Sequence, residues 1–313
     1  FSFEGVKGSY NFNSYGNNTL RDTNITTSKN FNDLKYLSIN NLLDNGITTN
    51  FEISLKNVNT TGKNDLEYKE KLHSKLMSAY TYNASLPMIK KTSSSFKTLE
   101  PKLSLRLSPN NMKDNKDLER RINIDNIFTS NRLSIEDSFE GGESLTLGLN
   151  FKKEKVNTIK ELTEINEYID FKLASVFRLN EEKNIPFNST LNKKVSNIFG
   201  EFKFRPIKNI SFSYDFSLTE DLSTLEYNSL VTKMELKNLT TQFDYLEESG
   251  AIGKTNVIEN KTKYIFDNSN SLSFNIRRNK KLNLTEYYNL VYEYKNDCLV
   301  AGIKYKKNYY NDA

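Results

Sequence analysis

Apolar and polar residues alternate at every second position through most of this chain. Residues 211–219 are typical, because one face carries Phe212, Tyr214, Phe216 and Leu218 and the other carries serines, Asp215 and Thr219. Residues 103–107, 144–151, 171–178 and 272–277 follow the same pattern. Successive side chains on a β-strand point to opposite faces, so the period of two predicts strands and not helices.

Short polar stretches separate these segments and have the composition of hairpin turns. Asn, Asp, Gly and Pro supply the backbone angles that such turns require. The clearest examples are Asp44–Gly46, Pro206–Asn209, Lys237–Asn238, Asp267–Asn270 and Lys295–Asp297. The pattern therefore predicts roughly 16 strands in an antiparallel meander, with longer loops at residues 110–117 and 180–192 and no helix of consequence.

A meander with one apolar face fits two architectures. A soluble β-sandwich buries that face between two sheets and has strands of about 5–6 residues. A membrane barrel turns that face to lipid, lines a wet lumen with the polar face, and has strands of about 9–11 residues. Segments such as 195–206 and 282–295 have the length that a barrel needs. Strand length therefore favours an all-β, antiparallel transmembrane β-barrel, here a partial barrel of roughly 16 strands of a larger one.

Composition narrows the class of protein further. Only 36% of the 313 residues are hydrophobic, yet aromatic residues reach 12%, which is unlike a disordered chain. The net charge of +5 is spread along the chain without a basic run, so no nucleic-acid partner is expected. No apolar run approaches the roughly 20 residues of a transmembrane helix. The chain begins at Phe1 in strand-like alternation, and we expect it to be an internal piece of a longer protein.

The sequence offers no catalytic or metal-binding constellation. His73 is the single histidine, and its neighbour Ser74 would point to the opposite face of a strand, so the two cannot readily act as base and nucleophile. No Cys/His cluster suits zinc. We therefore expect no catalytic residue, no metal and no cofactor.

Cys298 is the single cysteine and directly follows the turn Lys295–Asp297. In a secreted protein, an unpaired cysteine suggests a disulfide to a partner outside the visible sequence. The alternative is a free, buried thiol that acts as a small hydrophobic residue. The residues alone leave both readings open.

Three stretches together resemble the barrel domain of the LPS-assembly outer membrane protein family LptD, also called OstA or organic solvent tolerance. They are LVYEYKNDCLVAGIKYKKNYY at 290–310, NRLSIEDSFEGGESLTLG at 131–148, and LEPKLSLRLSP at 99–109. In the second stretch the family pattern is matched by Asn131, Arg132, Ser134, Asp137, Glu140 and Gly142. Ile135 departs from it where glycine is usual, as do Ser138 and Ser144 where arginines are common.

The resemblance implies a function, a location and partners. It implies that residues 1–313 are the C-terminal part of a barrel in the outer membrane of a Gram-negative cell, without the periplasmic N-terminal domain and the terminal strands. The expected function is the transfer of lipopolysaccharide (LPS) from a periplasmic bridge to the outer leaflet, without covalent chemistry. The implied partners are LPS, an LptE-like lipoprotein plug, an LptA-like bridge protein and outer-membrane lipid. It also implies that Cys298 pairs with a cysteine of the N-terminal domain.

Charged residues on the polar face are candidates for the LPS path. Lys and Arg there could bind LPS phosphates through charge-assisted hydrogen bonds, although a barrel lumen also carries both signs of charge for solvation alone. On the strands the candidates are Arg106, Lys152, Lys172, Arg178, Lys203 and Arg277. In the polar stretch 131–142 they are Arg132, Asp137 and Glu140, which could lie on the lumen wall or in a loop that shapes the path, with an ordinary turn as the alternative. Two other functions stay open, a general or substrate-specific outer-membrane channel and a soluble adhesin-like β-protein.

Overall fold

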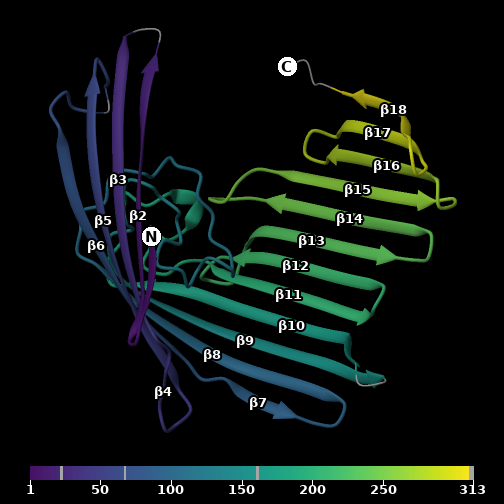
Figure 1. Ribbon diagram of the computed structural model, residues 1–313, viewed down its shortest axis with the longest axis horizontal. Helices are drawn as coiled ribbons and strands as arrows, with labels where there is room; N and C mark the ends of the chain where they lie inside the picture. Colours follow the sequence, from purple (N-terminus) through teal and green to yellow (C-terminus); the bar gives the residue numbers. More distant parts are fainter. Residues whose placement is uncertain (22–23, 67, 160–161, 310–313) are drawn as a thin grey trace. The chain divides into compact units, whose positions relative to one another are not determined.

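The computed structural model describes residues 1–21, 24–66, 68–159 and 162–309. These residues form an antiparallel sheet of 18 strands with one short 3₁₀ helix, η1 at Phe187–Ser189 (Figure 1). The first nine strands are β1 (Ser2–Gly5), β2 (Gly8–Arg21), β3 (Ile25–Ser38), β4 (Asn41–Leu42), β5 (Thr48–Lys63), β6 (His73–Ser85), β7 (Met88–Lys91), β8 (Ser95–Ser108) and β9 (Gly142–Ile159).

The remaining nine strands complete the meander. They are β10 (Leu162–Arg178), β11 (Ile198–Ile207), β12 (Ile210–Leu218), β13 (Leu225–Glu235), β14 (Leu239–Glu248), β15 (Asn256–Ile265), β16 (Asn270–Asn279), β17 (Leu284–Lys295) and β18 (Val300–Asn308). The short strands β4 and β7 pair with β5 and β8, while the long strands pair directly as β3–β5 and β6–β8. Short strands of this kind account for the difference between the predicted count of roughly 16 and the 18 observed.

The chain divides into two compact units. Unit 1 comprises residues 1–87, 100–148 and 174–196, and unit 2 comprises residues 88–99, 149–173 and 197–313. Within the described residues, no helix is long and apolar enough to cross a membrane.

In unit 1 the two faces of the long strands have opposite character. Along β5, Glu52, Ser54, Lys56 and Thr60 are buried, whereas Phe51 is 43% exposed. The buried polar residues lie beneath the connection 109–141, and we call this side the covered face. The opposite side, the open face, carries exposed apolar residues from three adjacent strands: Phe51, Tyr80, Tyr82, Leu105 and Leu107.

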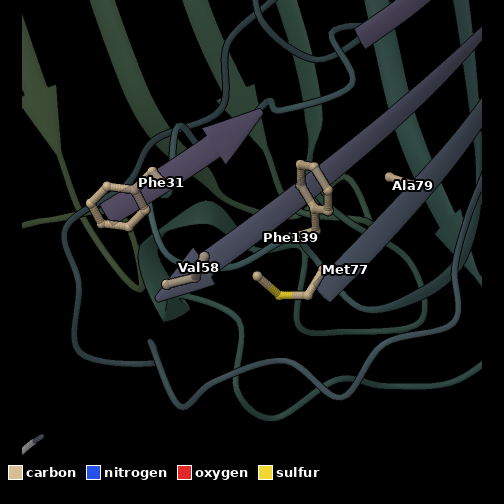
Figure 2. Close-up of a cluster of buried hydrophobic side chains, with 5 residues drawn as sticks. All are labelled: Phe31, Val58, Met77, Ala79 and Phe139. Carbon is tan, nitrogen blue, oxygen red and sulfur yellow. The ribbon is translucent and has the colours of Figure 1, made fainter. Parts of the chain in front are cut away.

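A small apolar core joins the connection 109–141 to the covered face (Figure 2). Phe139 of the connection is buried with Phe31, Val58, Met77 and Ala79 of the strands β3, β5 and β6. The sequence predicted that the polar face lines a water-filled lumen. In unit 1 the polar side chains of this face are instead largely buried, because the connection 109–141 packs on it.

Unit 2 is a regular meander in which β11 to β18 pair in chain order (Figure 1). Charged residues line one face, where Asp244 lies opposite Glu259 and Glu259 lies opposite Arg277. The other face exposes large apolar residues, among them Leu230, Phe243, Phe274 and Leu290. The predicted separation of an apolar face from a charged face is confirmed in these strands.

Candidate functional site

Glu140 is the centre of a cluster of buried charges in unit 1. Its carboxylate accepts two hydrogen bonds from Arg132, with Nε 2.7 Å from Oε2 and Nη2 2.6 Å from Oε1. Both side chains are buried. A bidentate arginine–carboxylate pair combines charge with a fixed planar geometry and is among the strongest side-chain contacts.

Two arginines from the strands complete this arrangement, which we call the arginine cluster (Arg106, Arg132, Glu140 and Arg178). Arg178, at the end of β10, places Nη1 2.5 Å from Glu140 Oε1, and its Nη2 donates to the carbonyl of Gly141. Arg106 on β8 donates from Nη1 to the Glu140 carbonyl at 2.7 Å and from Nε to the Ser130 carbonyl at 3.2 Å. The strands therefore hold the backbone of the connection 109–141 at three carbonyl groups, those of Ser130, Glu140 and Gly141.

The local backbone explains how the connection enters β9 beside these arginines. Gly142 has a φ of +80°, a conformation that L side chains rarely adopt. A Cβ atom at this position would lie 2.9 Å from Arg178 Nη2. Glycine is needed here both for the bend and for the close approach of the guanidinium group.

The electrostatics of the arginine cluster keep Glu140 ionised. Burial alone would raise the pKa of the Glu140 carboxyl, but the guanidinium groups of Arg132 and Arg106 hold it well below its usual range. Arg132 also donates to Ser144 Oγ and Thr146 Oγ1, both at 3.0 Å. Three guanidinium groups surround one carboxylate, so loss of the carboxylate would leave buried positive charge without its counter-ion.

Further contacts bind the connection 109–141 to the covered face. Lys56 of β5 donates to the Glu136 carbonyl at 2.8 Å and pairs with Asp33 at 3.0 Å. Asp137 pairs with Lys113 of the same connection at 2.7 Å. The Lys56 bond to Glu136 and the packing of Phe139 hold the connection against the strands, while the Asp137–Lys113 pair lies within the connection.

A cavity of about 470 Å³ lies between β3 and this connection. Its lining includes Lys29, Tyr68, Lys113, Arg120 and Asp137. Lys29 Nζ lies 4.4 Å from the centre of the Tyr68 ring, and Lys113 Nζ lies 5.2 Å from it. Cation–π contacts of this kind position the two ammonium groups at the cavity wall.

The other predicted site residues lie in unit 2 and have acidic partners of their own. Lys172 and Lys203 both bind Glu201, at 2.7 Å and 2.6 Å. Arg277 pairs with Glu286 at 2.8 Å, and Lys152 pairs with Glu154 at 2.6 Å. The structure thus brings four of the nine candidates into the arginine cluster, whereas Asp137, Lys152, Lys172, Lys203 and Arg277 form separate ion pairs.

Sequence reasoning missed several members of these networks. Lys56, Lys113, Phe139 and Glu201 were not predicted, although Lys56 falls on the polar positions of an alternating strand. The alternation could have selected Lys56, because it has the same parity as Glu52 and Ser54. No local signal marks Phe139, since its burial depends on strands that lie far away in the sequence.

Cys298 lies in the turn between β17 and β18. It is exposed and free, and its backbone N–H donates to Asn296 Oδ1 at 3.0 Å. The reading as a buried thiol is therefore wrong, and the disulfide stays a prediction. Among the described residues, no group of three or more His, Cys, Asp or Glu side chains is placed to hold a metal ion.

The fold and the separation of faces are those of an outer-membrane β-barrel protein, in which apolar residues meet lipid and polar residues lie on the inner side. A comparison with known protein families shows to which family of outer-membrane proteins the chain belongs. Residues 48–279 match LptD: LPS transport system D, and the chain belongs to this family. Members of the family serve LPS transport and assembly at the outer membrane, bind LPS and work with Lpt partner proteins. No individually curated protein matches the chain.

Proposed function

We propose that this chain is the C-terminal part of an LptD barrel that passes LPS to the outer leaflet along the charged face of its strands. The observation that carries the proposal is the division of the strands of unit 2 into an exposed apolar face and a charged face. Sugars and phosphates would move along the charged face, and no covalent step is required. An LptE-like plug and an LptA-like bridge, with an N-terminal periplasmic domain before residue 1, would complete the machine.

The connections give this proposal an orientation. The long connections 109–141 and 179–197 leave the strands at one end of unit 1, and the short turn 6–7 lies at the other. Extracellular loops of such barrels are long and periplasmic turns are short. We therefore place the long connections at the cell surface. The parity of the strands then puts the turn with Cys298 at the periplasmic side, within reach of a periplasmic cysteine.

The arginine cluster has a structural part in this proposal. Because Arg106, Arg132 and Arg178 are buried and bind Glu140 or the backbone, they hold the connection 109–141 on the covered face. The cations of the cavity next to this connection, Lys29 and Arg120, are better placed to meet LPS phosphates. In unit 2, LPS phosphates would be met by Lys172, Lys203 and Arg277.

A replacement of charge on the polar face tests the proposed path. Full-length protein carrying Lys172→Gln and Lys203→Gln is expected to lower the amount of newly made LPS that reaches the cell surface, measured by surface labelling. The matched control is Lys280→Gln with Lys281→Gln, which removes the same charge from an exposed turn. Unchanged LPS delivery, combined with free passage of small solutes, would instead favour the channel function.

A further inference from the structure

On the open face of unit 1, polar side chains replace the apolar ones along β2, β3 and β5 as the strands approach the end with the long connections, whereas β6 keeps the exposed Leu76 opposite Asn57. Paired positions on β2, β3 and β5 read Tyr10–Tyr36–Ile53, then Phe12–Leu34–Leu55, then Ser14–Asn32–Asn57, then Gly16–Asn30–Asn59. Ser74 of β6 lies opposite Asn59. All of these residues have the parity of the lipid-facing side, so the change marks the edge of the hydrocarbon layer.

The polar residues form one connected network across four strands, which we call the amide ladder (Ser14, Asn30, Asn32, Asn57, Asn59 and Ser74). Asn32 Nδ2 donates to Asn30 Oδ1 at 2.9 Å and to Asn57 Oδ1 at 3.2 Å, and Ser14 Oγ donates to Asn32 Oδ1 at 2.7 Å. Asn59 Nδ2 donates to Asn57 Oδ1 at 2.6 Å, and Asn57 Nδ2 donates to Ser74 Oγ at 3.1 Å. The network fixes the orientation of each amide.

The composition of the amide ladder indicates a recognition surface. Asparagine is depleted in strands, where β-branched and aromatic residues pack better, yet four asparagines occupy one face of β3 and β5. Each amide has two donors and a carbonyl with two lone pairs, and the network leaves part of this capacity unused at Asn30 and Asn59. An ordered array of neutral donors and acceptors matches the vicinal hydroxyl groups of a saccharide.

The lack of charged side chains around the amide ladder, and its height on the strands, indicate which ligand binds there. The open-face positions from Ser14 to Asn18 on β2, from Ser28 to Asn32 on β3 and from Asn57 to Thr61 on β5 carry no Lys, Arg, Asp or Glu. Such a surface selects hydroxyl groups over phosphates. The polar rows follow directly after the apolar rows along the strands, and each row lies about 7 Å beyond the one before it. The neighbouring groups at that height are the headgroups of lipids in the same leaflet.

We propose that the amide ladder binds the core saccharide of LPS that already resides in the outer leaflet, on the outside of the barrel wall. This contact involves the lipid-facing side, and the covered face plays no part in it. The inference uses the outer-membrane location of the family and the orientation proposed above, but it does not depend on the route by which LPS is delivered.

The test measures retention of LPS by the full-length protein after extraction in mild detergent. Protein with Asn30→Ala and Asn59→Ala loses the two amides whose hydrogen-bonding capacity the network leaves partly unused. We expect about 30-fold weaker retention of core-bearing LPS, since two lost hydrogen bonds of about 1 kcal/mol each exceed the 1.4 kcal/mol that corresponds to tenfold. Retention of lipid A without core sugars, and of phospholipid, should not change.

Control variants separate binding from folding and from transport. Asn45→Ala with Asn268→Ala removes two asparagines from exposed turns, away from both the amide ladder and the charged face, and should retain LPS normally. A shift in gel migration on heating shows that each barrel is folded, and the isosteric Asn59→Asp variant replaces the double variant if that one does not fold. Equal retention of core-bearing LPS by the ladder and control variants would overturn the proposal. A loss of retention that also affects lipid A would overturn it too, as would the finding that a protein, and not LPS, binds this face. Surface delivery of LPS should stay normal in the ladder variant, so a failure of the transport proposal is seen separately.

Discussion

Replacement of Glu140 by glutamine is the most informative single change in unit 1. Glutamine keeps the shape and part of the hydrogen bonding of the side chain but removes the charge that Arg132 and Arg178 bind at 2.5–2.7 Å. Removal of one partner from a buried ion pair typically costs about 3–5 kcal/mol, because the other charge stays buried without compensation. Two guanidinium groups bind this carboxylate and the third, that of Arg106, binds the Glu140 carbonyl, so we expect a loss within that range.

The assay is urea unfolding of the folded barrel in lipid vesicles at neutral pH. Glu140→Gln should lower the free energy of unfolding by about 3–5 kcal/mol. The matched control Glu143→Gln changes an exposed acid three residues away and should lower it by less than about 1 kcal/mol. A similar, small effect of both changes would refute the view that the arginine cluster holds the connection 109–141.

The pH dependence of the stability gives an independent check on the role of the Glu140 carboxylate. The pKa of Glu140 is lower in the folded state, so its contribution to stability is complete above the pKa of an unfolded glutamate, about 4.3. The contribution decreases as the pH falls below that value. The difference in stability between the unmodified protein and Glu140→Gln should therefore be constant near neutrality and shrink below about pH 4. A difference that does not depend on pH would assign the effect to packing alone.

Three further predictions concern other parts of the chain. Met77→Ala opens a cavity beneath Phe139 and should cost about 2–5 kcal/mol in the same unfolding assay, whereas Met88→Ala at an exposed position should cost far less. Leu105→Arg places a charge on the lipid-facing side and should cost about 2–4 kcal/mol in vesicles, with a smaller loss in detergent. Cys298 of the full-length protein should appear by mass spectrometry in a disulfide with an upstream cysteine, and recovery of free thiol alone would contradict this.

The alternation of residues was sufficient to predict the strands and their two faces. Phe212, Tyr214 and Phe216 share a face in β12 as expected, and the turns at 206–209, 237–238 and 267–270 join the predicted neighbours. These features depend on residues close together in the sequence, since a strand exposes every second side chain on each face. Short strands such as β4 and β7 have too few residues to show a period, and the predicted count was low for that reason.

The arginine cluster was predictable only in part. Arg106, Arg132, Glu140 and Arg178 were each selected as polar residues of interest. The pattern placed Arg106 and Arg178 on an open lumen wall, and Arg132 and Glu140 either there or in a loop that shapes the LPS path. Their burial depends on the connection 109–141 folding onto the strands, and Phe139 takes part in that fold through residues up to about a hundred positions away. Strand polarity cannot reveal whether water or another segment of the chain covers a polar face.

The sequence by itself determined that this protein is built of two-faced antiparallel strands and that one face is suited to lipid. Only the tertiary structure decided which polar residues meet water and which are buried, and which lipid-facing positions join into the amide ladder. The physical reason is the distance along the sequence over which each property is set. The direction of a side chain from a strand is a local property, whereas burial and hydrogen bonding across strands depend on register and on how distant segments pack.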